Sequence, residues 1–303
     1  MAKDKQIKHI DFRDQISKNK INSFFLLLIV FLVLIGMGYV IGKFINADFF
    51  VFMALFSVFS ILYIWLSYYY SSNIALWSVG AKEADKTKYR QLYNIVEGLT
   101  IGSGLPMPKI YVMQEESINA FATGRDPKNS VVCVTSGALD KLSKDELEGV
   151  LAHELSHIRN YDIRFVTIVA VVVGLISIIA QMFLRSLWLG GGSSRDNNSG
   201  KSDALLVVIG IVLAIIAPIV VKLVQLAISR KREYMADAGS VEITRYPKGL
   251  IGALEKIKND KKPMKVSSAV APMFISDPAK QRFFNLFQTH PPLDMRIQIL
   301  KQM

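Results

Sequence analysis

Residues 21–42, INSFFLLLIVFLVLIGMGYVIG, contain no charged side chain. A helix rises about 1.5 Å per residue, so this run is long enough to cross a hydrocarbon core about 30 Å thick. Three more uncharged blocks follow, at residues 49–81, 165–184 and 204–221. The sequence therefore predicts an α-helical integral membrane protein with four transmembrane helices, at residues 21–45, 49–70, 163–188 and 204–228.

These four blocks do not carry equal weight. The first two are too long and too uniform for the buried helices of a soluble core, whereas the third and fourth also fit short, shallow or buried helices. Residues 189–203 lie between the last two blocks and are rich in Gly, Ser and Asn, as in a flexible linker. We expect them to form an external loop.

The composition excludes several other classes of protein. With 51% hydrophobic residues among 303, the chain is too apolar to be intrinsically disordered. Cys133 is the single cysteine, which excludes a disulfide-stabilised scaffold. Its place in an apolar stretch predicts a role in core packing.

Positive charge is divided unequally between the two sides of this predicted topology. Of the 36 Lys and Arg residues, 31 lie in the basic N-terminal residues 1–20 and in residues 71–164 and 230–303, and 4 lie in the two opposite loops. Basic residues close to membrane helices favour the cytoplasmic side. We therefore expect a multi-pass protein of the plasma membrane whose termini and residues 71–162 and 229–303 are cytoplasmic. The net charge of +11 then reflects orientation and contact with the lipid bilayer, and no motif for binding nucleic acid accompanies it.

The longer cytoplasmic segment, residues 71–162, has the pattern of the first part of a folded domain. Helical spacing occurs over residues 84–100. Three strand-like stretches follow at residues 109–114, 118–123 and 130–134. A further helix is expected where Ser143 and Glu146 form a capping box. The sequence thus predicts a mainly α, α+β cytoplasmic domain with a small β-sheet, whose second part is residues 229–303.

The helix that follows the capping box carries His153-Glu154-Leu155-Ser156-His157. Two His four residues apart share one face of a helix, so both imidazoles can bind one ion, and neutral imidazole is a good ligand of zinc. Glu154 lies beside that ion, where it can accept a proton from a water that zinc has made acidic. A chance pair of His on a surface helix is the alternative interpretation.

A catalytic zinc needs a third protein ligand. The candidates that follow in the chain are His290 and acidic residues that include Asp162, Glu233, Asp237 and Glu242. A hairpin of the third and fourth membrane helices returns the chain to the face it left, which brings Glu233 back near His157. Asp237 lies four residues further along the same helical face and can hydrogen-bond a ligand imidazole. A solvated helix end is the alternative for Glu233 and Asp237.

Three motifs occur in a characteristic order along the chain. They are HELSH at residues 153–157, REYMAD at residues 232–237, and Thr289-His290-Pro291-Pro292 with Arg296. In this order, and together with the predicted membrane helices, they resemble the HtpX family of membrane zinc metalloproteases over nearly the whole chain. That family is related to the CAAX prenyl proteases and belongs to the gluzincins, named for a Glu as the third zinc ligand.

The resemblance implies a zincin-like metalloprotease domain with one Zn²⁺ per subunit. His153, His157 and Glu233 would be the zinc ligands. Glu154 would be the general base, and Asp237 would orient a ligand imidazole.

The resemblance also implies residues that contact the substrate. His290 would stabilise the oxyanion of the tetrahedral intermediate, a task that suits an N–H donor. Arg296 would contact the substrate backbone. Asn119, Ala120 and Phe121 would belong to an edge strand that aligns an extended peptide through main-chain hydrogen bonds. The alternatives are a structural turn for His290, a surface charge for Arg296 and a turn residue for Asn119.

The activity implied by the resemblance is zinc-dependent endoproteolysis at the cytoplasmic face, linked to stress. The polypeptide substrates would be misfolded or damaged membrane proteins. The prenyl proteases enclose a large chamber with more membrane helices than this chain has, so prenylated substrates are not expected. A zinc-binding membrane transporter or sensor and an inactive scaffold are the alternatives. Transporter ligands usually lie at mid-membrane depth, and the intact Glu154 argues against a scaffold.

Overall fold

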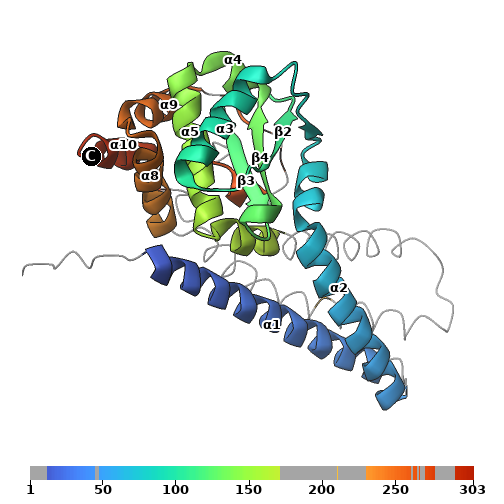
Figure 1. The fold of residues 1–303 in the computed structure, drawn as a ribbon. Helices are drawn as coiled ribbons and strands as arrows, with labels where there is room; N and C mark the ends of the chain where they lie inside the picture. The colour runs from blue at the N-terminus through green and yellow to red at the C-terminus, as the bar shows by residue number, and fades with distance from the viewer. Residues whose placement is uncertain are drawn as a thin grey trace, which may run out of the picture.

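The computed structural model of the chain describes residues 12–44, 48–170, 230–260, 270–276 and 291–303, together with 210, 262–264 and 266. Within these residues, two long helices, α1 (Phe12–Phe44) and α2 (Phe49–Ser78), extend beside a domain that combines helices with a small sheet (Figure 1). This arrangement agrees with the predicted combination of membrane helices and a mainly helical domain.

Helix α2 is suited to a bilayer by its length and surface. It begins after Asp48, whose carboxylate accepts a hydrogen bond from the N–H of Val51 at 3.0 Å. An apolar window within Phe50–Ser78 has a mean hydropathy of 2.2, and 6% of that window is buried. In the described part of the chain, α2 is the one helix long and apolar enough to cross a membrane.

The other three predicted membrane helices remain predictions. Helix α1 includes residues 21–44 of the predicted first span, 21–45, but starts nearer the N-terminus, at Phe12. Helix α2 contains the predicted second span and continues beyond residue 70 to Ser78. The predicted third and fourth spans lie mostly outside the described residues. The parts of this region that are described, residues 162–170 and 210, are helical. The predicted external loop lies entirely outside the described residues.

The domain contains a mixed four-stranded sheet in the order β1-β2-β4-β3. Strand β1 (Lys82–Glu83) is antiparallel to β2 (Lys109–Met113), which is parallel to β4 (Ser130–Thr135). Strand β3 (Ala120–Gly124) is antiparallel to β4 and lies at the edge of the sheet. The three longer strands correspond to the three predicted stretches, whereas β1 is too short to show an alternating pattern.

Strand β3 starts two residues later than predicted, because side chains take the hydrogen bonds of the preceding backbone. The N–H of Ile118 donates to the carboxylate of Asp260 at 2.8 Å. The N–H of Asn119 donates to the hydroxyl of Thr135 at 3.0 Å. Pairing with β4 therefore begins at Ala120.

The longer helices of the domain gather around α5, which packs on the sheet. They are α3 (Arg90–Ser103), α4 (Ser136–Lys141), α5 (Lys144–Arg159), α8 (Arg230–Thr244), α9 (Pro247–Asn259) and α10 (Leu293–Leu300), with 3-10 turns at Pro127–Asn129 and Ala271–Met273. The predicted capping box at the start of α5 is confirmed, since Ser143 and Glu146 each bond the other's backbone N–H. The helix expected from residue 84 begins only at Arg90, because Asp85 accepts hydrogen bonds from the next N–H groups and holds a turn.

Helix α5 is the centre of the domain, since it packs against α8, α9 and β3 (Figure 1). Two glycines allow the neighbouring helices to approach it closely. A Cβ on Gly149 of α5 would lie 2.5 Å from the backbone nitrogen of Leu250 in α9. A Cβ on Gly239 of α8 would collide with the side chain of Ser156 in α5. These contacts place the first turn of α8 beside the middle of α5.

Candidate active site

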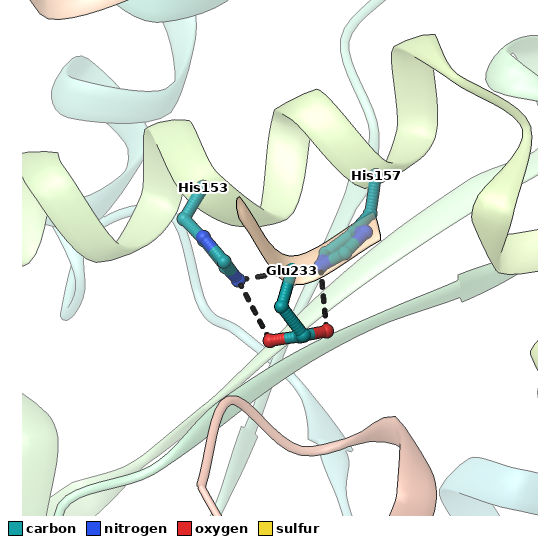
Figure 2. Close-up of side chains that lie close together, drawn as sticks. All are labelled: His153, His157 and Glu233. Carbon is teal, nitrogen blue, oxygen red and sulfur yellow. Dashed lines mark hydrogen bonds and ion pairs between the residues drawn. The ribbon is translucent and has the colours of Figure 1, made fainter. Parts of the chain in front are cut away.

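Helix α5 presents His153 and His157 on one face, one turn apart (Figure 2). Leu151, Leu155 and Ile158 are fully buried and fix the helix in the core. The two imidazole rings are nearly perpendicular, at 89°, with centroids 4.8 Å apart. Both rings direct Nε2 toward a carboxylate that comes from another helix.

That carboxylate belongs to Glu233 in the first turn of α8. One of its oxygens lies 3.8 Å from Nε2 of His153, and the other lies 3.5 Å from Nε2 of His157. The two Nε2 atoms are 3.2 Å apart. The structure thus brings together the three residues that the hairpin topology predicted to be close, although 76 positions separate His157 from Glu233.

The geometry of these three residues fits a tetrahedral metal ion. Ligands at about 2.0–2.1 Å from zinc in a tetrahedron are separated from one another by about 3.3–3.4 Å. The measured separations of 3.2, 3.5 and 3.8 Å are close to that value, and one ligand atom from each residue lies within 4.8 Å of the others. Two imidazoles and one carboxylate are also a ligand set used by catalytic zinc sites.

The other ring nitrogen of each His contacts a buried carboxylate. Nδ1 of His153 lies 3.0 Å from Asp237, and Nδ1 of His157 lies 2.9 Å from Asp162. When each Nδ1–H donates to its carboxylate, each Nε2 keeps the lone pair that a metal requires. The donor set therefore fits a divalent cation in its distances and in the tautomer that the two carboxylates favour.

The sequence named Asp162 only as a candidate third ligand, and its contact with His157 was not predicted. It lies past the end of α5, and its return to His157 depends on the left-handed conformation of Tyr161, whose φ is 59°. Its second oxygen accepts a hydrogen bond from the side-chain amide of Asn19 in α1 at 2.6 Å. The same amide donates to the backbone carbonyl of Asn160 at 2.9 Å. A side chain of α1 thus contacts the carboxylate that orients His157.

Burial and charge set the pKa values of the central groups. Burial lowers the pKa of His153 to about 4, and this outweighs its hydrogen bond to Asp237. For His157, the hydrogen bond to Asp162 and the charge of Glu233 outweigh burial and raise the pKa to about 9. The carboxylates around His157 therefore favour a positive charge at this position, as a site for a divalent cation would.

Glu154, the predicted general base, is buried close to His157 and Glu233. Its side chain is buried, accepts a hydrogen bond from the backbone N–H of Ala122 in β3, and has a pKa that burial raises to about 7. A carboxylate with a pKa near neutrality can both take and return a proton. A cavity of about 30 Å³ adjoins it. That cavity is lined by Glu154, His157 and Glu233 on one side and by Pro272, Met273, Phe274 and Ile275 on the other.

Arg296 of α10 is fully buried and does not reach solvent. Its guanidinium donates to both oxygens of Asp237, at 2.9 and 2.6 Å. Burial alone would raise the pKa of Asp237, but the charge of Arg296 and the contact with His153 hold it below its ordinary value. The surface-charge interpretation of Arg296 is therefore wrong. Asp237 lies between Arg296 and His153, so one buried chain of contacts runs from α10 to the candidate metal site.

The remaining predicted residues are Asn119, Ala120, Phe121, His290 and Cys133. Asn119, Ala120 and Phe121 lie at the edge strand β3, all buried. His290 lies outside the described residues. Cys133 is buried in β4, as predicted, and burial raises the pKa of its thiol.

These observations define a class of protein. A helix with two imidazoles and a buried Glu between them, a carboxylate from a second helix and an edge strand alongside are the parts of a zincin-type metallopeptidase domain. Here the domain is attached to a helix that is long and apolar enough to cross a membrane.

The comparisons with known proteins agree with this class. The model of peptidase family M48 matches residues 86–303. A protein named Protease HtpX homolog from Caldanaerobacter subterraneus subsp. tengcongensis is 46% identical over 294 residues, which cover 95% of this chain and 97% of the relative. The chain therefore belongs to peptidase family M48, among its HtpX homologues, and it is a metalloendopeptidase.

Further relatives show similar coverage. A Protease HtpX homolog from Thermoanaerobacter pseudethanolicus is 48% identical, over 83% of this chain and 84% of the relative. One from Dictyoglomus thermophilum is 42% identical, over 98% and 96%. Among solved structures, the crystal structure of S. mikatae Ste24p matches with a TM-score of 0.48 and 19% identity, and covers 95% of this chain and 66% of that one.

Proposed function

We propose that this chain is a zinc-dependent integral-membrane endopeptidase that hydrolyses misfolded or damaged membrane proteins at the cytoplasmic face. The observation that carries the proposal is the group of His153, His157 and Glu233 with Glu154 beside it. In this assignment, the first three residues hold one zinc ion. When bound, zinc acidifies water and polarises a carbonyl group.

The side chains around the metal then divide the catalytic work. Glu154 accepts a proton from the attacking water and passes it to the leaving amine, which its pKa of about 7 allows. Asp237 and Asp162 hold the two imidazoles in the orientation and tautomer that direct Nε2 to the metal. By the family resemblance, His290 donates a hydrogen bond to the developing oxyanion.

The position of the site supports action close to a membrane. The catalytic helix α5 leads directly into residues 162–170, which are helical and enter the predicted third span. Asn19 of α1 contacts Asp162 at the other side of His157. Two predicted membrane segments thus adjoin the candidate site. The excess of basic residues in the segments that we expect to be cytoplasmic supports the orientation.

The ligand assignment is tested by Glu233→Ala. Zinc content is measured on protein purified in detergent, with Glu242→Gln as the control because Glu242 lies in the same helix but 47% of its side chain is exposed. The proposal predicts one zinc per chain in the control and much less in Glu233→Ala. A fully loaded Glu233→Ala protein would refute this third ligand.

The substrate assignment needs a separate experiment. The purified protein and a multi-pass membrane protein are reconstituted into the same vesicles, with the substrate either folded or thermally unfolded. We expect cleavage of the unfolded form at segments on the side that exposes the catalytic domain. Equal cleavage of the two forms would contradict a role in quality control.

A further inference from the structure

One edge of β3 pairs with β4, and the other edge faces the catalytic groups. This second edge is covered. The backbone of Ala122 faces α5, because its N–H donates to Glu154. Two residues earlier, Ala120 directs its carbonyl to the same side of the strand. An unpaired strand edge of this kind is a general binding site for an extended peptide.

A segment of the chain itself lies along this edge. We name it the strap, and define it as Met273–Ser276. The N–H of Ile275 donates to the carbonyl of Ala120 at 3.0 Å, and Phe274 forms an antiparallel bridge with Phe121. The two aromatic rings also meet, with centroids 4.8 Å apart. The strap therefore lies against β3 as an additional antiparallel strand would.

Two side chains bond further backbone groups of the strap. The amide of Asn119 donates to the carbonyl of Ser276 at 3.2 Å and accepts from its N–H at 3.4 Å. Arg296 donates to the carbonyl of Ile275 at 3.1 Å. Asn119, Ala120, Phe121 and Arg296 are the four residues that the family resemblance assigns to the substrate, and each of them contacts the strap.

A substrate cannot use these groups while the strap is bound. The carbonyl of Ala120 and the amide of Asn119 would have to form the same hydrogen bonds with both peptides. The cavity between the strap and Glu154 has a volume of about 30 Å³. This holds about two water molecules and no peptide segment.

The main chain of the strap is not joined to β3 by a full ladder. It makes one main-chain hydrogen bond to Ala120, and the side chains of Asn119 and Arg296 and the burial of Phe274 and Ile275 hold it as well. In the described part of the chain, the hydroxyl of Ser276 is buried without a hydrogen-bond partner, which weakens its binding.

We propose that the strap is an intramolecular competitor that occupies the substrate groove and leaves when a polypeptide binds. This inference rests on the proposed function. The substrate then takes the place of the strap, antiparallel to β3, with main-chain hydrogen bonds to Ala120, Asn119 and Arg296. The class of substrate that fits is an extended, unfolded segment with an aromatic residue where Phe274 lies and an aliphatic residue where Ile275 lies. Such pairs are exposed when an apolar protein unfolds.

The experiment measures peptide binding in the full chain carrying Glu154→Gln, so that no cleavage intervenes. The probe is a fluorescent peptide with the sequence of residues 271–277, APMFISD. Ile275→Pro removes the N–H that bonds Ala120. Phe274 already has φ −77° and ψ 152°, which the residue before a proline prefers. Ser276→Ala removes the unpartnered hydroxyl, and Val96→Ala in α3 is a buried control distant in sequence from the strap.

The two strap variants are expected to change affinity in opposite directions. Ile275→Pro removes one hydrogen bond that holds the strap, so the variant protein should bind the peptide about three- to tenfold more tightly. Ser276→Ala should weaken binding about two- to fivefold, because the competitor is better satisfied. Val96→Ala should lower the melting temperature and leave the affinity unchanged.

An unchanged or weaker affinity in Ile275→Pro, together with a lower melting temperature, would show that the strap is a permanent part of the fold and would overturn the proposal. The same substitution is then made with Glu154 intact. Tighter peptide binding without cleavage of any substrate would support the strap and refute the protease function, so the two proposals fail separately.

Discussion

Asp237→Asn tests whether the buried chain of contacts from Arg296 to His153 supports the fold. The guanidinium of Arg296 is fully buried and makes its two strongest contacts with Asp237, at 2.6 and 2.9 Å. Glu233 is further away, at 3.5 Å. The Asn variant keeps the shape of the side chain but leaves the buried cation without its main counter-charge.

Removal of one partner from a buried pair costs about 3–5 kcal/mol. For a domain of this size, about 2–4 °C of melting temperature corresponds to each kcal/mol. We therefore expect Asp237→Asn to lower the melting temperature by about 6–20 °C. The measurement is thermal unfolding in detergent with a chelator present, so that loss of metal does not contribute to the difference.

The matched control changes the same charge on the same helix. Glu242→Gln breaks the pair with Arg159 at 2.7 Å, but the Glu242 side chain is 47% exposed, so the loss should be about 0–1 kcal/mol. The double variant Asp237→Asn/Arg296→Met removes the buried cation as well and should recover part of the stability. Equal melting temperatures for Asp237→Asn and Glu242→Gln would show that Asp237 does not stabilise the buried Arg296.

Three more predictions follow from other contacts. Asn19→Ala removes the amide that bonds Asp162, so zinc affinity should fall by up to about tenfold and the visible spectrum of the cobalt-loaded protein should change, whereas an unchanged spectrum would show that α1 does not position His157. Gly149→Ala places a Cβ 2.5 Å from Leu250 N and should destabilise the domain by about 1–3 kcal/mol, measured by chemical denaturation. A variant as stable as the wild type would contradict this prediction. Ser194→Cys should react with a membrane-impermeant thiol reagent only from outside the cell, and labelling from the cytoplasmic side would overturn the predicted topology.

The parts of the fold that local sequence determines were predictable. The capping box of Ser143 and Glu146 marked the start of α5, and the spacing of His153 and His157 placed both rings on one face. Glu233 was predicted because a membrane hairpin returns the chain to the same side, a constraint that acts over any sequence distance.

The features that the sequence did not reveal depend on long-range or unusual backbone contacts. Asp162 reaches His157 only because Tyr161 adopts a left-handed conformation, which a Tyr rarely does. Its contact with Asn19 joins residues 143 positions apart. The strap carries no motif, since its position on β3 arises from main-chain hydrogen bonds that any residue except proline could make. The burial of Arg296 likewise follows from its pairing with Asp237, which spacing alone does not show.

Cleavage of casein by wild type and by Glu154→Gln, at equal measured zinc content, shows whether Glu154 is the general base of a zinc-dependent protease. Both proteins should hold one zinc per chain, because Glu154 is not a ligand in this geometry. The wild type should cleave casein, and the variant should lose at least about a hundredfold in rate, since the general base is absent. A Glu154→Gln protein that holds zinc and cleaves casein as fast as the wild type would contradict this role of Glu154.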